Sequence, residues 1–373
     1  LDTKNNRMPL ENNKVVYLAI LVFAFLLYGN TLTHDYSLDD SIVIIQNQFT
    51  KKGFEGISDI LSNDTFTGFF GRQKNLVSGG RYRPLSLVTF AIEWEFFGKS
   101  PSVSHFINIL LYAFTCMLLF NLLNRMLSRY KYHKHWFYNI PFLATILFLF
   151  HPIHTEVIAN IKGRDEIMTM LGSLIAMHYS FKYLDTNKIK YYIFSFVALF
   201  LALMSKENAI TFVGIFPVSV YFFTDHKWKK NLRATSALVL ASILFIFIRT
   251  SVIGIPDSEP AKELMNNPFL YASGSEKIAT ILFTWLIYLK LLIIPHPLSF
   301  DYYPKQIPIV SFSDKYVILS LIIFISLAVI AIMGIKKKRL ISYSIIFFLF
   351  FFSIVSNLFF NICDFMHSRF MFF

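Results

Sequence analysis

Apolar runs recur along the whole chain and alternate with short polar segments. The first run covers residues 15–28 and is followed by a long polar stretch, residues 29–101. A helix needs about 20 apolar residues to cross the hydrocarbon core of a bilayer, and the flanks of a shorter run can complete it. The pattern predicts an all-α polytopic membrane protein, with further spans at residues 103–123, 140–150, 167–183, 191–204, 209–223, 232–248, 278–294, 317–333 and 341–360.

Basic clusters between these runs indicate how the chain crosses the membrane. Lys and Arg collect in cytoplasmic loops. If the spans alternate, one side of the membrane receives the basic N-terminal segment and the clusters at 125–135, 182–190 and 226–233. Residues 29–101 then form the first extracytoplasmic loop. Within that loop we expect an amphipathic helix near residues 56–70.

Residues 278–294 break this alternation, because a single crossing there would place the basic cluster 336–339 outside. Lys290 lies within the segment, and Pro295 and Pro297 follow it directly. Non-helical backbone is tolerated at membrane depth where it lines a cavity. We therefore expect this segment to be re-entrant or to lie along the membrane surface.

The amino-acid composition also favours a membrane protein, and it indicates which classes of partner to expect. Of the 373 residues, 55% are hydrophobic, against about 45–50% in soluble domains, and the mean hydropathy is +0.52. Basic cytoplasmic loops explain the formal net charge of +12, so we expect membrane lipids and no nucleic acid as partners. Of the two cysteines, Cys116 lies inside an apolar run, which disfavours a disulfide framework.

Unusual polar groups gather on the predicted outer side. Ionisable side chains at the ends of membrane spans need a partner or a water-filled site. Their convergence on one face therefore predicts an outward-facing cavity. The candidate side chains are the acid pair Asp39 and Asp40, together with Arg83, His151, His154, Glu156, Arg164, Glu166, Lys206 and Glu207.

Several of these groups also have an ordinary structural explanation. Asp39 and Asp40 could be solvated loop acids, or they could cap the helix that follows. Arg83 could anchor the chain at the membrane interface. His151 and His154 could be interfacial histidines, because the ring has an apolar body and a polar tip.

Two local patterns are weak evidence for a functional site when each is taken alone. The pattern H-x-x-H-x-E at residues 151–156 has some metal-ligand character. However, its acid stands two residues after the second histidine, which fits one helical face poorly. We therefore expect no metal and no cofactor. Lys206 and Glu207 could form a plain local ion pair, which contributes little if it is exposed.

Together, the outer groups allow a specific reaction. A carboxylate near the membrane surface can act as general base on an acceptor hydroxyl, and Lys or Arg can hold a phosphate. An outward cavity between helices suits a lipid-linked phosphate donor whose tail stays in the bilayer. The combination predicts glycosyl transfer from a lipid phosphate carrier. A transporter is disfavoured because the polar groups lie at one face rather than at the midplane, and a non-catalytic membrane scaffold is the third alternative.

Long segments of the chain resemble a known family. They occur in the order "GNTLTHDYSLDDSIVIIQN", "RYRPLSLVTFAIEWEFFGKSPSVSHFINILLY", "LFLFHPIHTEVIANIKGRDEI", "LALMSKENAIT" and "YLKLLIIPHPLSFDYYP". These segments resemble the transmembrane and tetratricopeptide-repeat (TMTC-like) O-mannosyltransferases, of the GT-C membrane glycosyltransferase type. The resemblance runs from about residue 15 to the end of the chain.

The resemblance implies a GT-C-like helix bundle over residues 1–373 that moves mannose from a polyprenyl-phosphate carrier to Ser or Thr hydroxyls of an acceptor protein. The active site would face the non-cytoplasmic side and require no metal. The family's acidic pair falls on Asp39 and Asp40, one of which would be the general base, and analogy with related GT-C enzymes favours Asp39. The matched cations would bind the donor phosphate, and the remaining residues would shape the cavity: Arg83, His151, His154, Glu156, Arg164, Glu166, Lys206 and Glu207.

The sequence departs from the family after the membrane part. Family members usually carry tetratricopeptide repeats there and this sequence has none, so we expect either a fragment or a form without repeats. Frequent Phe, Ile, Lys and Asn are typical of a low-GC bacterium, which favours an undecaprenyl carrier and a periplasmic site at the bacterial inner membrane. In a eukaryote the site would face the lumen of the endoplasmic reticulum. Lipid A or another surface glycan is the alternative acceptor.

Overall fold

The computed structural model describes residues 10–73, 80–128, 136–254, 267–299, 302, 306–358 and 365–372. Within these ranges all regular structure is helical, and no strand occurs among them. Four described helices are long and apolar enough to cross a membrane, or five if the bent pair Ile140–Phe150 and Pro152–Ala159 forms one span. The predicted all-α polytopic membrane fold is confirmed.

The chain divides into two compact units. Unit 1 comprises Leu1–Lys74, Arg81–His151 and Val157–Gly254, and unit 2 comprises Asn75–Gly80, Pro152–Glu156 and Ile255–Phe373. The main helices of unit 1 are α1 (Leu10–Tyr28), α4 (Pro84–Phe97), α5 (Pro101–Met126), α6 (Ile140–Phe150), α8 (Arg164–Thr186), α9 (Ile189–Ser205), α10 (Thr211–Phe223) and α11 (Trp228–Ile253). Those of unit 2 are α12 (Gly274–Ile293), α13 (Lys315–Ile335) and α14 (Leu340–Val355). Over the described residues, each predicted apolar run coincides with one of these helices to within about five residues at its ends, and residues 359–360 of the last run lie outside the described ranges.

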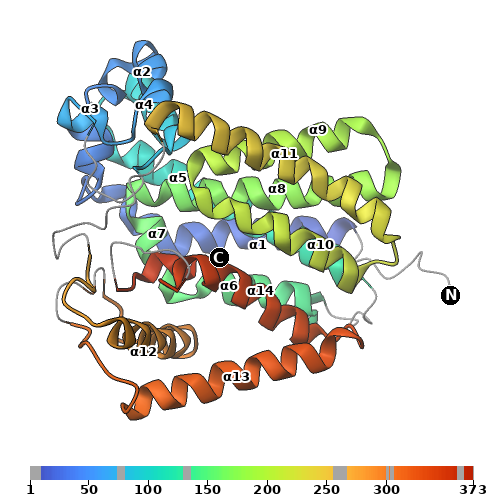
Figure 1. Ribbon diagram of the computed structural model, residues 1–373. Helices are drawn as coiled ribbons and strands as arrows, with labels where there is room; N and C mark the ends of the chain where they lie inside the picture. The colour runs from blue at the N-terminus through green and yellow to red at the C-terminus, as the bar shows by residue number, and fades with distance from the viewer. Residues whose placement is uncertain are drawn as a thin grey trace. The chain divides into compact units, whose positions relative to one another are not determined.

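An antiparallel hairpin of α8 and α9 organises unit 1 (Figure 1). The left-handed conformation of Asn187, with φ at 54°, ends α8. The two helices approach closely because Gly172 has no side chain: a Cβ there would stand 2.9 Å from that of Ala202. Midway along the hairpin, the buried hydroxyls of Ser180 and Ser195 are 2.5 Å apart. Close packing and buried hydrogen bonds thus fix the register of the hairpin.

The remaining helices of unit 1 pack around this hairpin. α5 lies against α8, and α11 lies against α9 (Figure 1). α1 and α6 in turn pack against α5. Because α8 begins and α9 ends at the same end of the bundle, residues at the start of α8 and just after α9 meet there.

The segment between α1 and α5, the predicted first extracytoplasmic loop, does not contain the expected single amphipathic helix at residues 56–70. It holds short turns, namely η1 (Gly29–Thr33), η2 (Ser41–Ile45), η3 (Thr50–Gly56), α2 (Ile57–Ser62) and α3 (Thr67–Phe70). Asn63 is extended between α2 and α3, so the predicted helix is broken. The long helix of the loop is α4, which begins with Pro84 in its first turn. Its buried face, with Leu87 and Phe90, packs against η2 and α2 in a small apolar core.

Unit 2 contains α12, α13, α14 and the short turn η8 (Ser368–Met371). α12 is continuous and starts with a complete capping box between Ser273 and Glu276. The helical part of residues 278–294 is therefore unbroken, while its inclination to the membrane stays a prediction. The rings of Trp285, Phe324 and Phe352 pack together where the three long helices meet.

Candidate active site

Asp40 is held inside unit 1 by two backbone groups. Its Oδ2 accepts a hydrogen bond from the Ser37 N–H at 3.0 Å, and its Oδ1 accepts one from the Lys162 N–H at 2.8 Å. The residue is 1% exposed. Burial raises the pKa of this carboxyl to about 6, helped by the neighbouring Asp39 and opposed by the two hydrogen bonds. Asp40 thus fastens the segment between α1 and α4 to the turn before α8.

Asp39 occupies a different environment although it is the adjacent residue. Its side chain is partly exposed, and its backbone carbonyl accepts hydrogen bonds from Ile42 and Val43 at the start of η2. The preceding residue, Leu38, has φ at 48°, a left-handed conformation that costs energy for a leucine. A strained turn therefore presents Asp39 toward solvent while Asp40 points inward.

A network of charges surrounds the turn that Asp40 contacts. The Arg83 guanidinium binds both carboxylate oxygens of Glu207, at 2.9 Å and 2.6 Å, and reaches Asp165 at 3.3 Å. The Lys162 ammonium lies 3.4 Å from the same Asp165 oxygen. Bidentate Arg–carboxylate pairs are strong and fix geometry. The network therefore joins the residue before α4, the start of α8 and the start of η7 (Glu207–Ile210).

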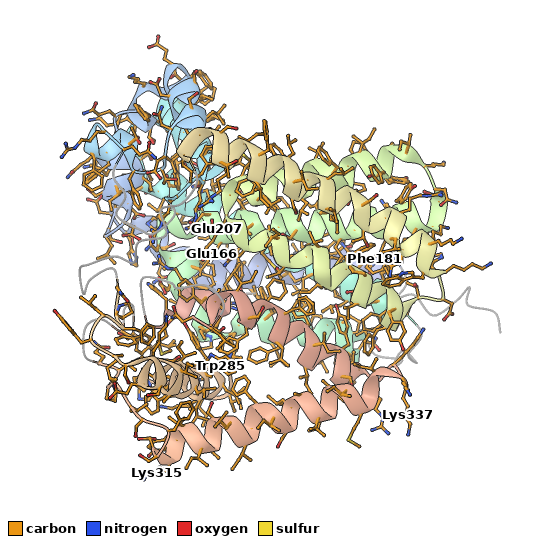
Figure 2. All side chains as sticks on the ribbon, in the orientation of Figure 1. Glu166, Phe181, Glu207, Trp285, Lys315 and Lys337 are labelled. Carbon is orange, nitrogen blue, oxygen red and sulfur yellow. The ribbon has the colours of Figure 1, made fainter. Side chains whose placement is uncertain are left out.

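Two further ion pairs are more deeply buried. Lys206 pairs with Glu166, and the two side chains are 4% and 1% exposed. Arg164 pairs with Glu93 and is itself fully buried. Figure 2 marks Glu166 and Glu207 at this end of the hairpin and Phe181 nearer its turn. The charged groups of these two pairs are almost inaccessible to a ligand. Their contribution is to hold the surrounding helices in place.

The Arg164 guanidinium has several partners from different helices. Its Nε donates to Asn108 Oδ1 on α5 at 2.7 Å, and its Nη2 donates to the Ser104 carbonyl at 3.0 Å. The Phe90 ring lies 4.4 Å below the guanidinium carbon. Arg164 therefore ties α4, α5 and α8 together.

The histidine motif is divided between the units. His151 is the last residue of a unit 1 segment, whereas His154 and Glu156 belong to unit 2. The His154 ring contacts Phe372 with a centroid separation of 5.0 Å. Glu156 Oε2 lies 3.0 Å from Nδ1 of His367. Across the ranges that the structure describes, no three His, Cys, Asp or Glu side chains are placed to hold a metal ion.

The structure thus joins some predicted residues and separates others. Asp39, Asp40, Arg83, Lys206 and Glu207 gather at one end of unit 1, with Arg164 and Glu166 buried beneath them.

The sequence analysis did not single out four members of the network as site residues: Glu93, Asn108, Lys162 and Asp165. Asp165 follows Arg164 directly in the quoted segment "LFLFHPIHTEVIANIKGRDEI", and Lys162 stands two residues before it, so this segment was a usable signal. Glu93 is a single acid in an apolar stretch, and its partner is 71 residues away in the sequence.

Comparison with known proteins finds two matching family models. Residues 84–253 match the family model described as dolichyl-phosphate-mannose-protein mannosyltransferase. Residues 257–328 match the family model described as protein O-mannosyl-transferase TMTC, DUF1736. No solved structure matches the chain significantly.

Curated relatives carry the same name. The Caenorhabditis elegans protein O-mannosyl-transferase F38B6.6 is 27% identical over 76% of this chain and 39% of its own length. Human protein O-mannosyl-transferase TMTC2 is 28% identical over 76% of this chain and 34% of its own length. Mouse TMTC4 is 25% identical over 92% of this chain and 52% of its own length. The chain thus spans about a third to a half of the length of these three relatives, and it is similar to the TMTC-like protein O-mannosyltransferases.

Proposed function

We propose that the chain carries the catalytic membrane part of a protein O-mannosyltransferase. It would move mannose from a polyprenyl-phosphate carrier to Ser or Thr hydroxyls of proteins on the non-cytoplasmic side of the membrane. The observation that carries the proposal is the pairing of a partly exposed Asp39 with a buried, backbone-anchored Asp40 beside a cationic turn. The relatives named as protein O-mannosyl-transferases support the same reaction.

Asp39 is the general base in this proposal, and Asp40 is a positioning residue. A base must reach the proton that it removes, and Asp39 is the more accessible of the two carboxylates. Both oxygens of Asp40 already accept backbone hydrogen bonds, from Ser37 and Lys162. Asp40 therefore holds the loop conformation that presents Asp39.

Arg83 and Lys162 are the cations proposed to meet the donor phosphate. Their side chains keep 11% and 12% exposure, and they converge on Asp165. Lys206 and Arg164 are much less accessible because Glu166 and Glu93 cover them. Both cations can donate hydrogen bonds to phosphate oxygens, while Glu207 and Asp165 hold them in place.

The reaction balances as a single displacement. Asp39 takes the proton of the acceptor hydroxyl, whose oxygen forms a bond to C1 of mannose. The bond between C1 and the phosphate oxygen breaks, and its electron pair leaves with the polyprenyl phosphate. Arg83 and Lys162 stabilise the negative charge that grows on that phosphate.

The proposed function also includes the membrane and the side of it that the active site faces. Charged loops at the turn of the hairpin face the cytoplasm under the positive-inside rule, which puts the acid pair on the opposite side. We propose a bacterial inner membrane with the site facing the periplasm and an undecaprenyl carrier. In a eukaryotic cell the site would face the lumen of the endoplasmic reticulum.

Transfer of labelled sugar tests the proposal. Membranes containing the full chain receive radiolabelled polyprenyl-phosphate mannose, and label in protein is measured for the wild type and for the double variant Asp39→Asn/Asp40→Asn. Asp35→Asn is the matched control, because Asp35 is an exposed acid of the same loop. We expect label in the wild type and the control only. Equal label in the double variant contradicts the proposal, and mass spectrometry of the products distinguishes a protein acceptor from lipid A or another glycan.

A further inference from the structure

A second polar site lies at the other end of unit 1. α8 starts beside the acid pair and runs for 23 residues to Thr186, a length of about 34 Å at 1.5 Å per residue. α10 also runs away from the acid pair, because η7 begins at Glu207 and α10 ends at Phe223. The α8–α9 turn and the α10–α11 turn therefore meet at this far end.

A hollow with a volume of about 420 Å³ opens between these two turns. We call it the basic hollow. Its charged lining consists of Lys227, Lys229, Lys230 and Arg233 against a single acid, Asp225. Asn187, at the end of α8, adds an amide to the wall. The lining therefore carries a net charge of +3 from four cations and one acid.

The four cations of the basic hollow have no ion-pair partner among the described residues. The nearby Arg125 behaves differently, because it pairs with Asp185 at 2.7 Å. The positive-inside rule accounts for basic residues at this end of a bundle. It does not account for their convergence in one hollow without acidic partners.

The position of these cations at the N-terminus of α11 also favours a bound anion. Lys229 and Lys230 lie in the first turn of α11, a helix of 26 residues, and Lys227 is its N-cap without a side-chain hydrogen bond. The N-terminus of a helix carries partial positive charge and free N–H groups, so cations there are unfavourable and anions are favoured. A bound anion would satisfy the helix end and the cations together.

Exposed apolar residues at the start of α11 and the end of α10 favour a ligand at the membrane surface. Trp228 is 60% exposed and Leu232 is 49% exposed on the same turns of α11. Tyr221, near the end of α10, is 41% exposed. Exposed aromatic rings at the ends of membrane helices sit at the headgroup level of the bilayer. Exposed apolar side chains thus stand next to the cations along α11, because Trp228 precedes Lys229 and Leu232 precedes Arg233.

We propose that the basic hollow binds a phosphate ester, supplied by the headgroup of an anionic lipid in the leaflet at this end of the bundle. The cations and the N-terminus of α11 bind the phosphate, and Trp228 and Leu232 contact the lipid chains. This site is separate from the acid pair and does not depend on the proposed reaction.

Lipid binding to the purified full chain tests the proposal. Native mass spectrometry in detergent measures the dissociation constants of phosphatidylglycerol and phosphatidylcholine, which share chain length. The test variant is Lys229→Gln/Lys230→Gln/Arg233→Gln. The matched control is Lys336→Gln/Lys337→Gln/Arg339→Gln, which removes the same charge from the turn between α13 and α14. We expect the test variant to weaken phosphatidylglycerol binding by on the order of a hundredfold, and the control to change it little.

Two further measurements complete the experiment. In the first, soluble glycerol phosphate competes with phosphatidylglycerol. If it does not displace the lipid, the result supports a lipid ligand; if it displaces the lipid at an equal concentration, the result supports a phosphate site with a water-soluble ligand. Lys229→Gln alone, at an exposed position, repeats the measurement with minimal risk to folding. Equal weakening in the two triple variants, or equal binding of the two lipids by the wild type, overturns the proposal.

Discussion

Asp39 and Asp40 show how two identical neighbours acquire different tasks. The sequence alone gives them the same chemistry. The left-handed turn at Leu38 and the hydrogen bond from Lys162 place one carboxylate inside the protein and leave the other accessible. The candidate base is therefore assigned by backbone geometry, which no local pattern in the sequence reveals.

The raised pKa of Asp40 predicts a pH-dependent stability. The pKa rises from 3.8 in the unfolded chain to about 6 in the folded protein, so the carboxyl favours folding when protonated. That contribution is complete below about pH 4 and is lost as the pH rises through about 6, by roughly 3 kcal/mol. We expect the melting temperature of the wild type, relative to that of Asp40→Asn, to fall between pH 4 and pH 7. A difference in melting temperature that stays constant between pH 4 and pH 7 would show that Asp40 does not titrate in this range.

At the residue scale, some candidates named from the sequence come together in the structure. Arg164, Glu166, Lys206 and Glu207 stand in two short segments of the sequence and take part in ion pairs at one end of unit 1. Glu93 was missed because nothing near it in the sequence indicates a partner 71 residues away. Long-range ion pairs are products of packing, and a single sequence does not encode them in a readable form.

At the scale of elements, the length of each apolar run was the reliable indicator of a helix. Each apolar run became a helix because a helix satisfies its own backbone hydrogen bonds in an apolar environment. α4 was missed because Glu93 and Glu95 interrupt its apolar pattern. The amphipathic helix expected at residues 56–70 was wrong, because extended Asn63 divides α2 from α3.

Arg164 is predicted to be the main polar link between α4, α5 and α8. Arg164→Gln leaves the Glu93 carboxylate buried without its cation, so we expect a loss of about 3–5 kcal/mol in the free energy of unfolding. Lys52→Gln breaks an exposed pair with Asp59 and should cost less than about 1 kcal/mol. Thermal unfolding in detergent measures both variants. Similar losses in the two would remove Arg164 from this role.

At the scale of the whole molecule, unit 1 carries polar chemistry at both ends. The acid pair and its cations occupy the end where α8 begins, and the basic hollow occupies the end where α8 turns into α9. A helix bundle of this length matches the thickness of a bilayer. The proposed function therefore predicts that the two ends face opposite aqueous phases.

Labelling of introduced cysteines tests this topology. In a background without Cys116 and Cys363, we place single cysteines by Asp35→Cys, Lys229→Cys and Lys337→Cys. An impermeant maleimide applied to intact cells should label the first position. Positions 229 and 337 should react only after permeabilisation, because we expect α12 not to span the membrane. Labelling of position 337 from outside would instead show that α12 crosses once.

The most direct test of the account is the rate of mannose transfer by Asp39→Asn. We expect kcat to fall by roughly 10²–10⁴-fold, the range for loss of a general base, while the KM for the lipid-linked donor stays near that of the wild type. Asp35→Asn should retain full activity. A normal rate in Asp39→Asn, combined with an inactive Asp40→Asn that folds normally, would contradict the assignment and make Asp40 the base.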